Sequence, residues 1–262
     1  MQSCRPPVAA QALALPAHFA WVTSAYPEAL TEVVVDAELE LPPDPSVGFY
    51  LGLFGKTTTD TEFYAGLQTQ LHDPNTPAWL GPGFLFSRWS PHTRADARPV
   101  ADGFVEVGAH EGGFVGVRRA RAWGPGLVHF RLRRGEPEAG HDWFIFDAAV
   151  GDGAWEEVGA LRFARTDPAT PIAFHEEVTV FLEVYRGVTD VAEVPRWPVR
   201  FRVRGDGAAP TQVRVEYPRF PKVEFPNSDL WWDDGWVKAV TGAMTPRCHG
   251  PGEVFRAPSA SR

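Results

Sequence analysis

The feature that most constrains the fold is an alternation of residue types between positions 32 and 41. On one face of this segment fall the apolar residues Val33, Val35, Ala37, Leu39 and Leu41. The charged members are Glu32, Asp36, Glu38 and Glu40. A period of two sends one set toward a core and the other toward water, as in an antiparallel strand. The pattern recurs to the C-terminus, and no segment keeps a 3.6-residue period over ten residues. The sequence therefore predicts an all-β fold, an antiparallel two-sheet jelly-roll sandwich.

The domain organisation follows from length and from where proline accumulates. The chain has 262 residues, a length that one large sandwich can reach. Its 25 glycines and 25 prolines stand singly between apolar runs, which indicates many turns. We predict a loose arm over residues 1–16 and a single β-sandwich domain over residues 17–262. Proline is frequent in residues 190–262, so an accessory wrapping layer there remains an alternative.

Composition limits the classes of ligand and partner that we expect for this protein. Hydrophobic residues make up 44% of the chain, and ten tryptophans are present, a load that suits either a thick core or platforms for flat ligands. The net charge of −8 argues against nucleic acid and anionic membranes. No apolar run approaches the ~18 residues of a membrane-spanning helix. We expect a carbohydrate or small-molecule ligand and no cofactor or metal; the oligomeric state stays open.

The two cysteines and the N-terminus bear on the compartment. Cys4 and Cys248 lie near opposite ends of the chain and lack metal-ligand spacing. One terminal disulfide and two free thiols in a reducing cytosol fit equally well. Residues 1–15 make a poor secretory signal, so a cytoplasmic location is favoured over secretion.

Several short segments, taken in order, are similar to a known family. Phe63-Tyr64-Ala65-Gly66-Leu67-Gln68 precedes Phe84-Leu85-Phe86-Ser87-Arg88-Trp89, and a glycine-rich stretch follows at residues 108–116. The later matches are residues 123–126, 131–133, 143–147, 155–159 and 181–183. Over about residues 45–190 this order resembles a bacterial domain-of-unknown-function family (number 3472). The resemblance implies a concanavalin-like β-sandwich and an association with carbohydrate, and it transfers no catalytic residue. This chain departs from the family in having His110-Glu111-Gly112-Gly113 where a Gly-Glu-Gly-type turn is usual.

The first candidate ligand row begins at the end of the first of these segments. Gln68, Gln70 and His72 share one parity, so a regular strand would place them on one face. Arg88 and Trp89, at the end of residues 83–89, have the residue types that line glycan-binding sheets and complete this candidate set. The alternative interpretation, which we favour, is a solvated strand face running into a loop.

The second candidate row surrounds Glu183. If Val178, Val180, Leu182 and Val184 face the core, then Phe181, Glu183 and Tyr185 line a second surface. A carboxylate between two aromatic rings can bind a sugar or act as a catalytic acid or base. The favoured alternative is an ion pair between Glu183 and an arginine on a neighbouring strand.

Two further places carry weaker signals. His110 and Glu111 stand beside a double glycine and are candidate catalytic residues, although an ordinary turn explains them better. Trp231 and Trp232 belong to the segment Trp231-Trp232-Asp233-Asp234-Gly235-Trp236, which can close a ligand groove or clamp one end of the sandwich.

Three functions remain open from the sequence. The first is a carbohydrate- or small-ligand-binding sandwich with an aromatic-lined concave face. The second is a glycoside hydrolase or polysaccharide lyase on the same fold, which needs two carboxylates at a defined separation or an equivalent acid–base pair. The third is a structural or partner-binding protein.

Overall fold

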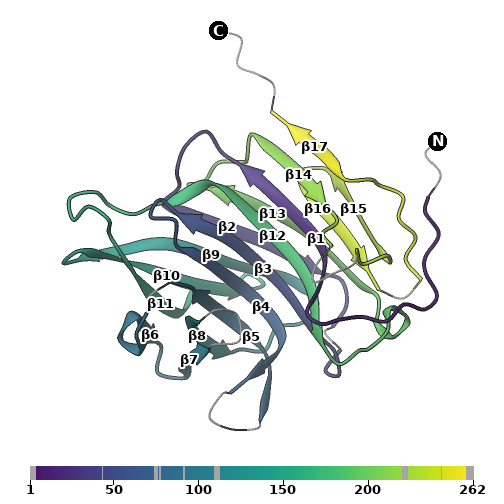
Figure 1. The fold of residues 1–262 in the computed structure, drawn as a ribbon, viewed down its shortest axis with the longest axis horizontal. Coiled ribbons are helices and arrows are strands. Elements are labelled where there is room, and N and C mark those ends of the chain that lie inside the picture. Colours follow the sequence, from purple (N-terminus) through teal and green to yellow (C-terminus); the bar gives the residue numbers. More distant parts are fainter. Residues whose placement is uncertain are drawn as a thin grey trace.

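The computed structural model describes residues 4–257 except residues 43, 74, 75, 77, 91, 109–112, 220–223 and 243. Its described residues contain no α-helix, and two 3₁₀ turns, η1 (Arg94–Asp96) and η2 (Val191–Glu193), are the helical segments among them. All other regular elements are strands, arranged as two antiparallel sheets (Figure 1). The prediction of an all-β, two-sheet sandwich is confirmed.

One sheet has nine strands, and it carries the site described below. In spatial order it contains β17 (Gly252–Arg256), β14 (Gln212–Glu216), β1 (Ala17–Ala25), β12 (Phe174–Arg186), β3 (Gly48–Thr57), β4 (Glu62–His72), β5 (Trp79–Arg88), β8 (Phe114–Ala120) and β7 (Gly103–Gly108).

The other sheet has eight strands. In spatial order it contains β15 (Ser228–Asp233), β16 (Trp236–Thr241), β13 (Trp197–Gly205), β2 (Glu32–Leu39), β9 (Gly126–Glu138), β10 (His141–Val150), β11 (Glu156–Ala164) and β6 (Ala97–Pro99). Strands formed by residues 197–256 enter both sheets, beside β1 on one side and beside β2 on the other.

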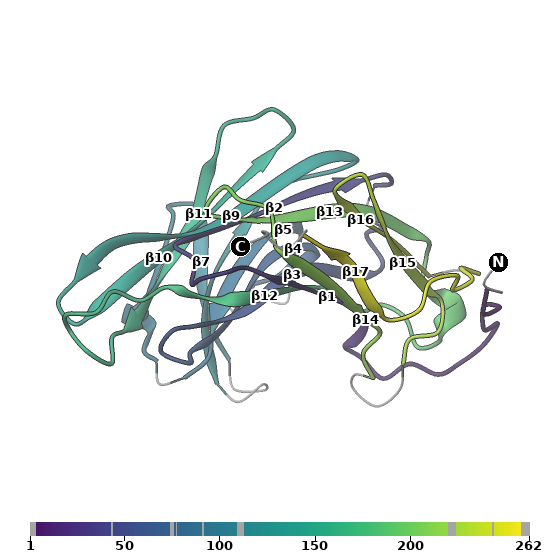
Figure 2. The same cartoon turned by 90° about the horizontal axis from the view of Figure 1, so that it is seen from above.

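The core lies between the two layers, which Figure 2 shows stacked and bending together, with the nine-stranded sheet on the inner side of the arch. Its largest fully buried side chains are all phenylalanines, among them Phe49, Phe86 and Phe146. Burying one such ring contributes roughly 1.5–3 kcal/mol. On β9 the apolar residues of an alternating run, Val128, Phe130 and Leu132, are all fully buried.

The strand that opened the sequence analysis departs from the predicted pattern in two places. Leu41 was expected in the core, but β2 ends at Leu39 and Leu41 is 40% exposed. Asp36 was expected in water, yet it is 1% exposed and accepts hydrogen bonds from His129 Nδ1, Arg202 Nε and Arg204. Long side chains on β9 and β13 cover this carboxylate and supply its hydrogen bonds, which is how a buried charge is tolerated.

The two ends of the chain are fastened together. Cys4 and Cys248 form a disulfide, which resolves the alternative left open by the sequence. Beside it, Arg5 and Arg247 exchange backbone hydrogen bonds. The segment predicted as a loose arm also pairs at Ala12 with Asp190.

Candidate functional site

The side of the nine-stranded sheet that faces away from the core carries a cluster of rings and aliphatic side chains. We name this cluster the aromatic face. Its buried members are Tyr50, Leu71, Leu85 and Phe181, and its partly buried members are Trp21, Phe54, Tyr64 and Tyr185. The opposite side of the same strands already packs the core, so this surface would ordinarily be polar. A second cluster of buried and partly buried apolar side chains on this side of the sheet makes it the candidate site.

Two glycines on β3 allow the rings of β12 to lie close to the sheet. A Cβ atom at Gly52 would stand 2.3 Å from the Phe181 ring, and one at Gly48 would stand 2.6 Å from the Tyr185 ring. Only a residue without a side chain fits under such a contact. Phe181 then meets the Tyr50 ring edge-on, with centroids 4.9 Å apart at 84°. The outward positions of β3 therefore alternate between glycine and an aromatic residue.

A β-bulge in β1 brings two side chains to this face that a regular strand would separate. The register of β1 against β12 shifts between His18 and Ala20. Residues 18 and 21 are three positions apart, which in a regular strand places them on opposite faces. The bulge places His18 and Trp21 on the same face. The His18 ring stacks on the Phe181 ring with centroids 5.1 Å apart, and it meets the Trp21 ring edge-on with centroids 5.8 Å apart.

His18 links Trp21 to Glu183 through hydrogen bonds. The indole Nε1–H of Trp21 donates to His18 Nδ1 over 2.7 Å. A nitrogen that accepts carries no proton, so the neutral ring holds its proton on Nε2. That Nε2–H faces Glu183 Oε2 at 2.7 Å. The Glu183 carboxylate, 8% exposed, is thus fixed in position by a histidine of defined tautomer.

Glu183 belongs to a row of side chains that crosses four strands. The register pairs His18 with Glu183, Glu183 with Tyr50, and Tyr50 with Gln68. Adjacent strands lie about 4.8 Å apart, so Gln68 and Glu183 are separated by roughly 10 Å along this row. Gln68 offers an amide at one end of the row, and Glu183, beside His18 at the other end, offers a carboxylate, with the Tyr50 ring between them.

A second charged group borders the face on β7 and β8. Arg118, opposite Leu85 in the sheet, is 7% exposed and forms an ion pair with Glu106. Burial by itself would lower the pKa of Arg118, but the neighbouring Tyr64 hydroxyl and Glu106 carboxylate outweigh it and raise the pKa above its ordinary value. Arg118 therefore stays charged under the edge of the aromatic face.

Of the residues predicted from the sequence, one group lies together on the aromatic face. Phe181, Glu183, Tyr185 and Gln68 all point to this side, and Trp89 reaches its edge, where its ring meets Tyr64 at 4.7 Å. The expected arginine partner of Glu183 is replaced by His18. Whether these residues bind a ligand or catalyse a reaction stays a prediction.

The row Gln68, Gln70 and His72 is not formed. The register of β4 against β5 shifts between Gln68 and Leu71 and again before His72, so Leu71 takes the place on the aromatic face. Gln70 is buried and donates from Nε2 to the Pro45 carbonyl. His72 is exposed and packs against Trp79.

Three other predicted ligand residues lie away from this face. Arg88 points inward, where it pairs with Asp96 and covers the Phe163 ring. Trp231 and Trp232 lie on β15 at the edge of the other sheet; the first stacks on His249 and the second on Phe255. The predicted catalytic residues His110 and Glu111 lie outside the described residues.

Sequence reasoning missed His18, Trp21, Tyr50, Tyr64 and Arg118. The β-bulge that joins His18 to Trp21 leaves no mark in the alternation of residue types. Tyr50 could have been found, because every second position from 48 to 54 is in turn glycine or aromatic: Gly48, Tyr50, Gly52 and Phe54.

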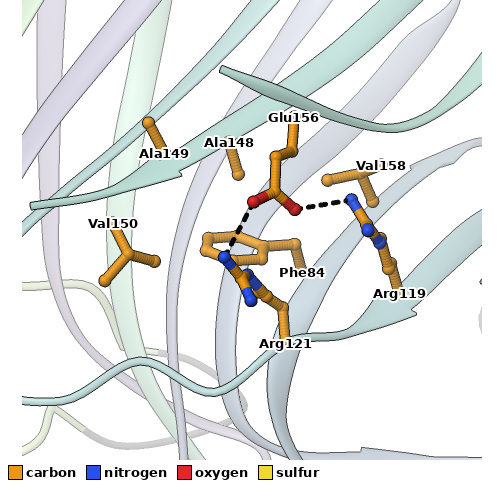
Figure 3. Close-up of a pocket in the computed structure, with 8 residues that line it drawn as sticks. All are labelled: Phe84, Arg119, Arg121, Ala148, Ala149, Val150, Glu156 and Val158. Carbon is orange, nitrogen blue, oxygen red and sulfur yellow. Dashed lines mark hydrogen bonds and ion pairs between the residues drawn. The ribbon is translucent and has the colours of Figure 1, made fainter. Parts of the chain in front are cut away.

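A small hollow at the side of the sandwich does not qualify as a ligand site. Figure 3 shows Glu156 lying between Arg119 and Arg121 above the Phe84 ring, with ion-pair distances of 3.1 and 2.7 Å. Its volume is about 10 Å³, room for about one water molecule. In the part of the chain that the structure describes, no cluster of three or more His, Cys, Asp or Glu side chains is arranged to hold a metal ion. The described residues also include no helix long and apolar enough to span a membrane.

Comparison with known proteins gives structural neighbours only. No family model matches the chain, and the search of curated proteins found no match. Scytalido-glutamic peptidase, solved with a peptide-based transition-state analogue, is similar at a TM-score of 0.43 and 8% identity, over 86% of this chain and 98% of that one. SCP-B, a member of the eqolisin family of peptidases solved with a tripeptide, is similar at a TM-score of 0.42 and 7% identity over the same shares. Values this low assign no activity to the chain.

Proposed function

We propose that the aromatic face binds a carbohydrate or a chemically similar small ligand. The observation that carries the proposal is the presence, on one sheet face, of several half-buried rings beside a fixed carboxylate and an amide. Sugars present C–H faces that stack on rings and hydroxyl groups that hydrogen-bond to polar side chains. Trp21, Tyr64 and Tyr185 supply ring surface, and Glu183 and Gln68 supply hydrogen-bonding groups.

The pre-formed geometry of Glu183 supports binding. Its hydrogen bond from His18 and the stacking of His18 on Phe181 hold the carboxylate in place before any ligand arrives. A pre-organised polar group loses little conformational entropy on binding. Affinity is then expected to depend on His18 as well as on the residues that touch the ligand.

Binding is favoured over hydrolysis by the positions of Glu106 and Glu216, two other carboxylates among the described residues of this sheet. Glycoside hydrolysis requires two carboxyl groups about 5–10 Å apart. Glu106 lies five strand spacings from Glu183, roughly 24 Å. Glu216 lies two strands away, paired with Trp21 in register and with Arg214 in an ion pair. Through Trp21, Glu216 is level with Phe181, two residues before Glu183 along β12. The backbones at Glu216 and Glu183 are therefore about 12 Å apart.

The disulfide bears on the compartment in which the protein would bind its ligand. Disulfides persist in oxidising compartments and are rare in the cytosol. The bond between Cys4 and Cys248 therefore favours an extracytoplasmic location over the cytoplasmic one expected from the sequence, and glycans are abundant there.

Calorimetric titration against a panel of oligosaccharides tests the proposal. We expect saturable binding by the wild type that weakens at least tenfold in Trp21→Ala and Glu183→Gln. Trp155→Ala is the matched control, because Trp155 is 39% exposed and meets His129 and Arg131 of the eight-stranded sheet. Absence of binding to every saccharide, or equal affinity in all variants, would reject it. Turnover of a saccharide that is lost in Glu183→Gln would instead support the enzyme alternative.

A further inference from the structure

A second hollow lies at the open end of the sandwich, away from the aromatic face. Its volume is about 370 Å³, within the range of roughly 300–1,000 Å³ that small-molecule pockets occupy. Val22 and Val213 of the nine-stranded sheet and Phe201 and Val237 of the eight-stranded sheet line it. Protein interiors are otherwise close-packed, so a space of this size between two sheets is unusual.

One wall of this inter-sheet pocket bridges the two layers. The rings of Trp232 on β15 and Phe255 on β17 stack with centroids 5.0 Å apart at 14°. Both rings are partly buried against the core. They present a flat apolar surface next to the pocket, which suits a ligand with an aromatic or alicyclic body.

Of the described residues that line this space, Ser24 alone carries a hydroxyl group. Ser24 has the parity of Val22 on β1, lines the pocket and is 2% exposed. None of the described residues gives its Oγ a hydrogen bond. Its Oγ keeps some contact with open space, so a molecule in the pocket can reach it and form a hydrogen bond. The partner that fits is a hydrogen-bonding group on a bound molecule.

Among the described residues, no charged group reaches into the pocket to match a charged ligand. Arg202 and Arg204 border it through their strand, but their guanidinium groups lie on the other side of β13, where both bind Asp36. A charge placed among Val22, Phe201 and Val237 would lose its hydration without compensation. The ligand chemistry that fits is therefore neutral.

We propose that the inter-sheet pocket binds a small, neutral, lipophilic molecule that carries one hydrogen-bonding group, which pairs with Ser24. This site is independent of the aromatic face and of its proposed carbohydrate ligand. The apolar body of the molecule packs between the two sheets against Trp232 and Phe255, and its polar group meets the Ser24 hydroxyl.

Titration of the full chain with N-phenyl-1-naphthylamine, a neutral fluorescent aromatic amine with one N–H donor, tests this proposal. We expect one saturable site in the wild type. Ala209→Trp, at an exposed position on the pocket rim, and Val237→Phe, inside it, should each weaken binding at least tenfold by filling the space. Ser24→Ala should weaken it about fivefold, the effect of one hydrogen bond.

The controls separate this pocket from other apolar surfaces. Ala169→Trp adds the same indole at an exposed turn elsewhere and should leave the affinity unchanged. If Val237→Phe does not fold, Ala209→Trp decides, because its side chain is exposed. Absence of saturable binding, or binding unaffected by Ala209→Trp, would overturn the proposal. Binding lost in Phe181→Ala but retained in Ala209→Trp would place the probe on the aromatic face and would also overturn it.

Discussion

The contact between Gly52 and Phe181 yields the sharpest prediction about the candidate site. A methyl group at position 52 would stand 2.3 Å from the Phe181 ring and 2.9 Å from the Tyr50 ring, where ordinary contacts begin near 3.4 Å. The ring of Phe181 would have to move by about 1 Å against its neighbours, and overpacking of this kind costs about 1–3 kcal/mol. At this chain length each kcal/mol lowers the melting temperature by about 2 °C, so Gly52→Ala should lower it by roughly 2–6 °C.

A double-mutant cycle isolates that contact. In Phe181→Ala the ring is absent, so adding Gly52→Ala should cost at least about 1 kcal/mol less than it does in the wild type. Gly124→Ala serves as the control, because a Cβ atom there meets nothing within 4 Å and the substitution gives the same change in unfolded-chain entropy. Urea unfolding of the four variants measures the coupling. If the effects of the two substitutions add to within about 0.5 kcal/mol, the ring does not lie over Gly52 and the description of the aromatic face is wrong.

The remaining predictions concern stability. Asp142 is 1% exposed and accepts hydrogen bonds from two Arg165 nitrogens, one of them Nε, and from the Ile172 backbone N–H. Asp142→Ala should therefore lower the free energy of unfolding, measured in urea, by about 3–5 kcal/mol. A loss under about 1 kcal/mol would contradict this. Burial would raise the pKa of Asp142, but these hydrogen bonds hold it below its ordinary value, so its stabilisation is present above about pH 4 and is lost as the pH falls through the lowered pKa. Unfolding measured between pH 6 and 2 should therefore show a steeper acid loss in the wild type than in Asp142→Asn, and parallel curves would refute the assignment. Reducing the disulfide, or replacing Cys4 and Cys248 by serine, should cost about 2–5 kcal/mol because the bond closes a loop spanning nearly the whole chain; an unchanged melting temperature with dithiothreitol would show that the bond is not formed.

Alternation of residue types was sufficient to predict the fold class and many of the strands. It succeeds at Val128, Phe130 and Leu132 because one face of β9 packs the core along its length. It fails at Asp36, because a period-two pattern assumes that the second face meets water. Three side chains from neighbouring strands cover Asp36, and their arrival depends on a register that the local sequence does not encode.

The candidate site was predicted best where the strand is regular. β12 keeps its alternation through Phe181 and Glu183, and Tyr185 stays on the same side although the register against β3 shifts after Val184, so the prediction that all three share one surface holds. Gln70 was misplaced because β4 contains an irregularity that substitutes Leu71 for it on the aromatic face. His18 was missed for the same kind of reason, since its contact with Glu183 depends on a bulge in β1.

Two departures from regular pairing therefore determine the chemistry of this face. The bulge in β1 adds a histidine beside the one buried carboxylate of the central row, and the irregularity in β4 removes a glutamine and adds a leucine. A regular β1 would leave Glu183 without its Nε2–H donor, and a buried carboxylate without a donor is strongly disfavoured. The bulge and Glu183 are thus mutually dependent: the bulge makes a buried carboxylate tolerable, and that carboxylate gives an otherwise apolar face a polar group with a fixed direction. Since bulges re-aim side chains and recur next to active sites, this pairing supports the proposed ligand-binding role of the face.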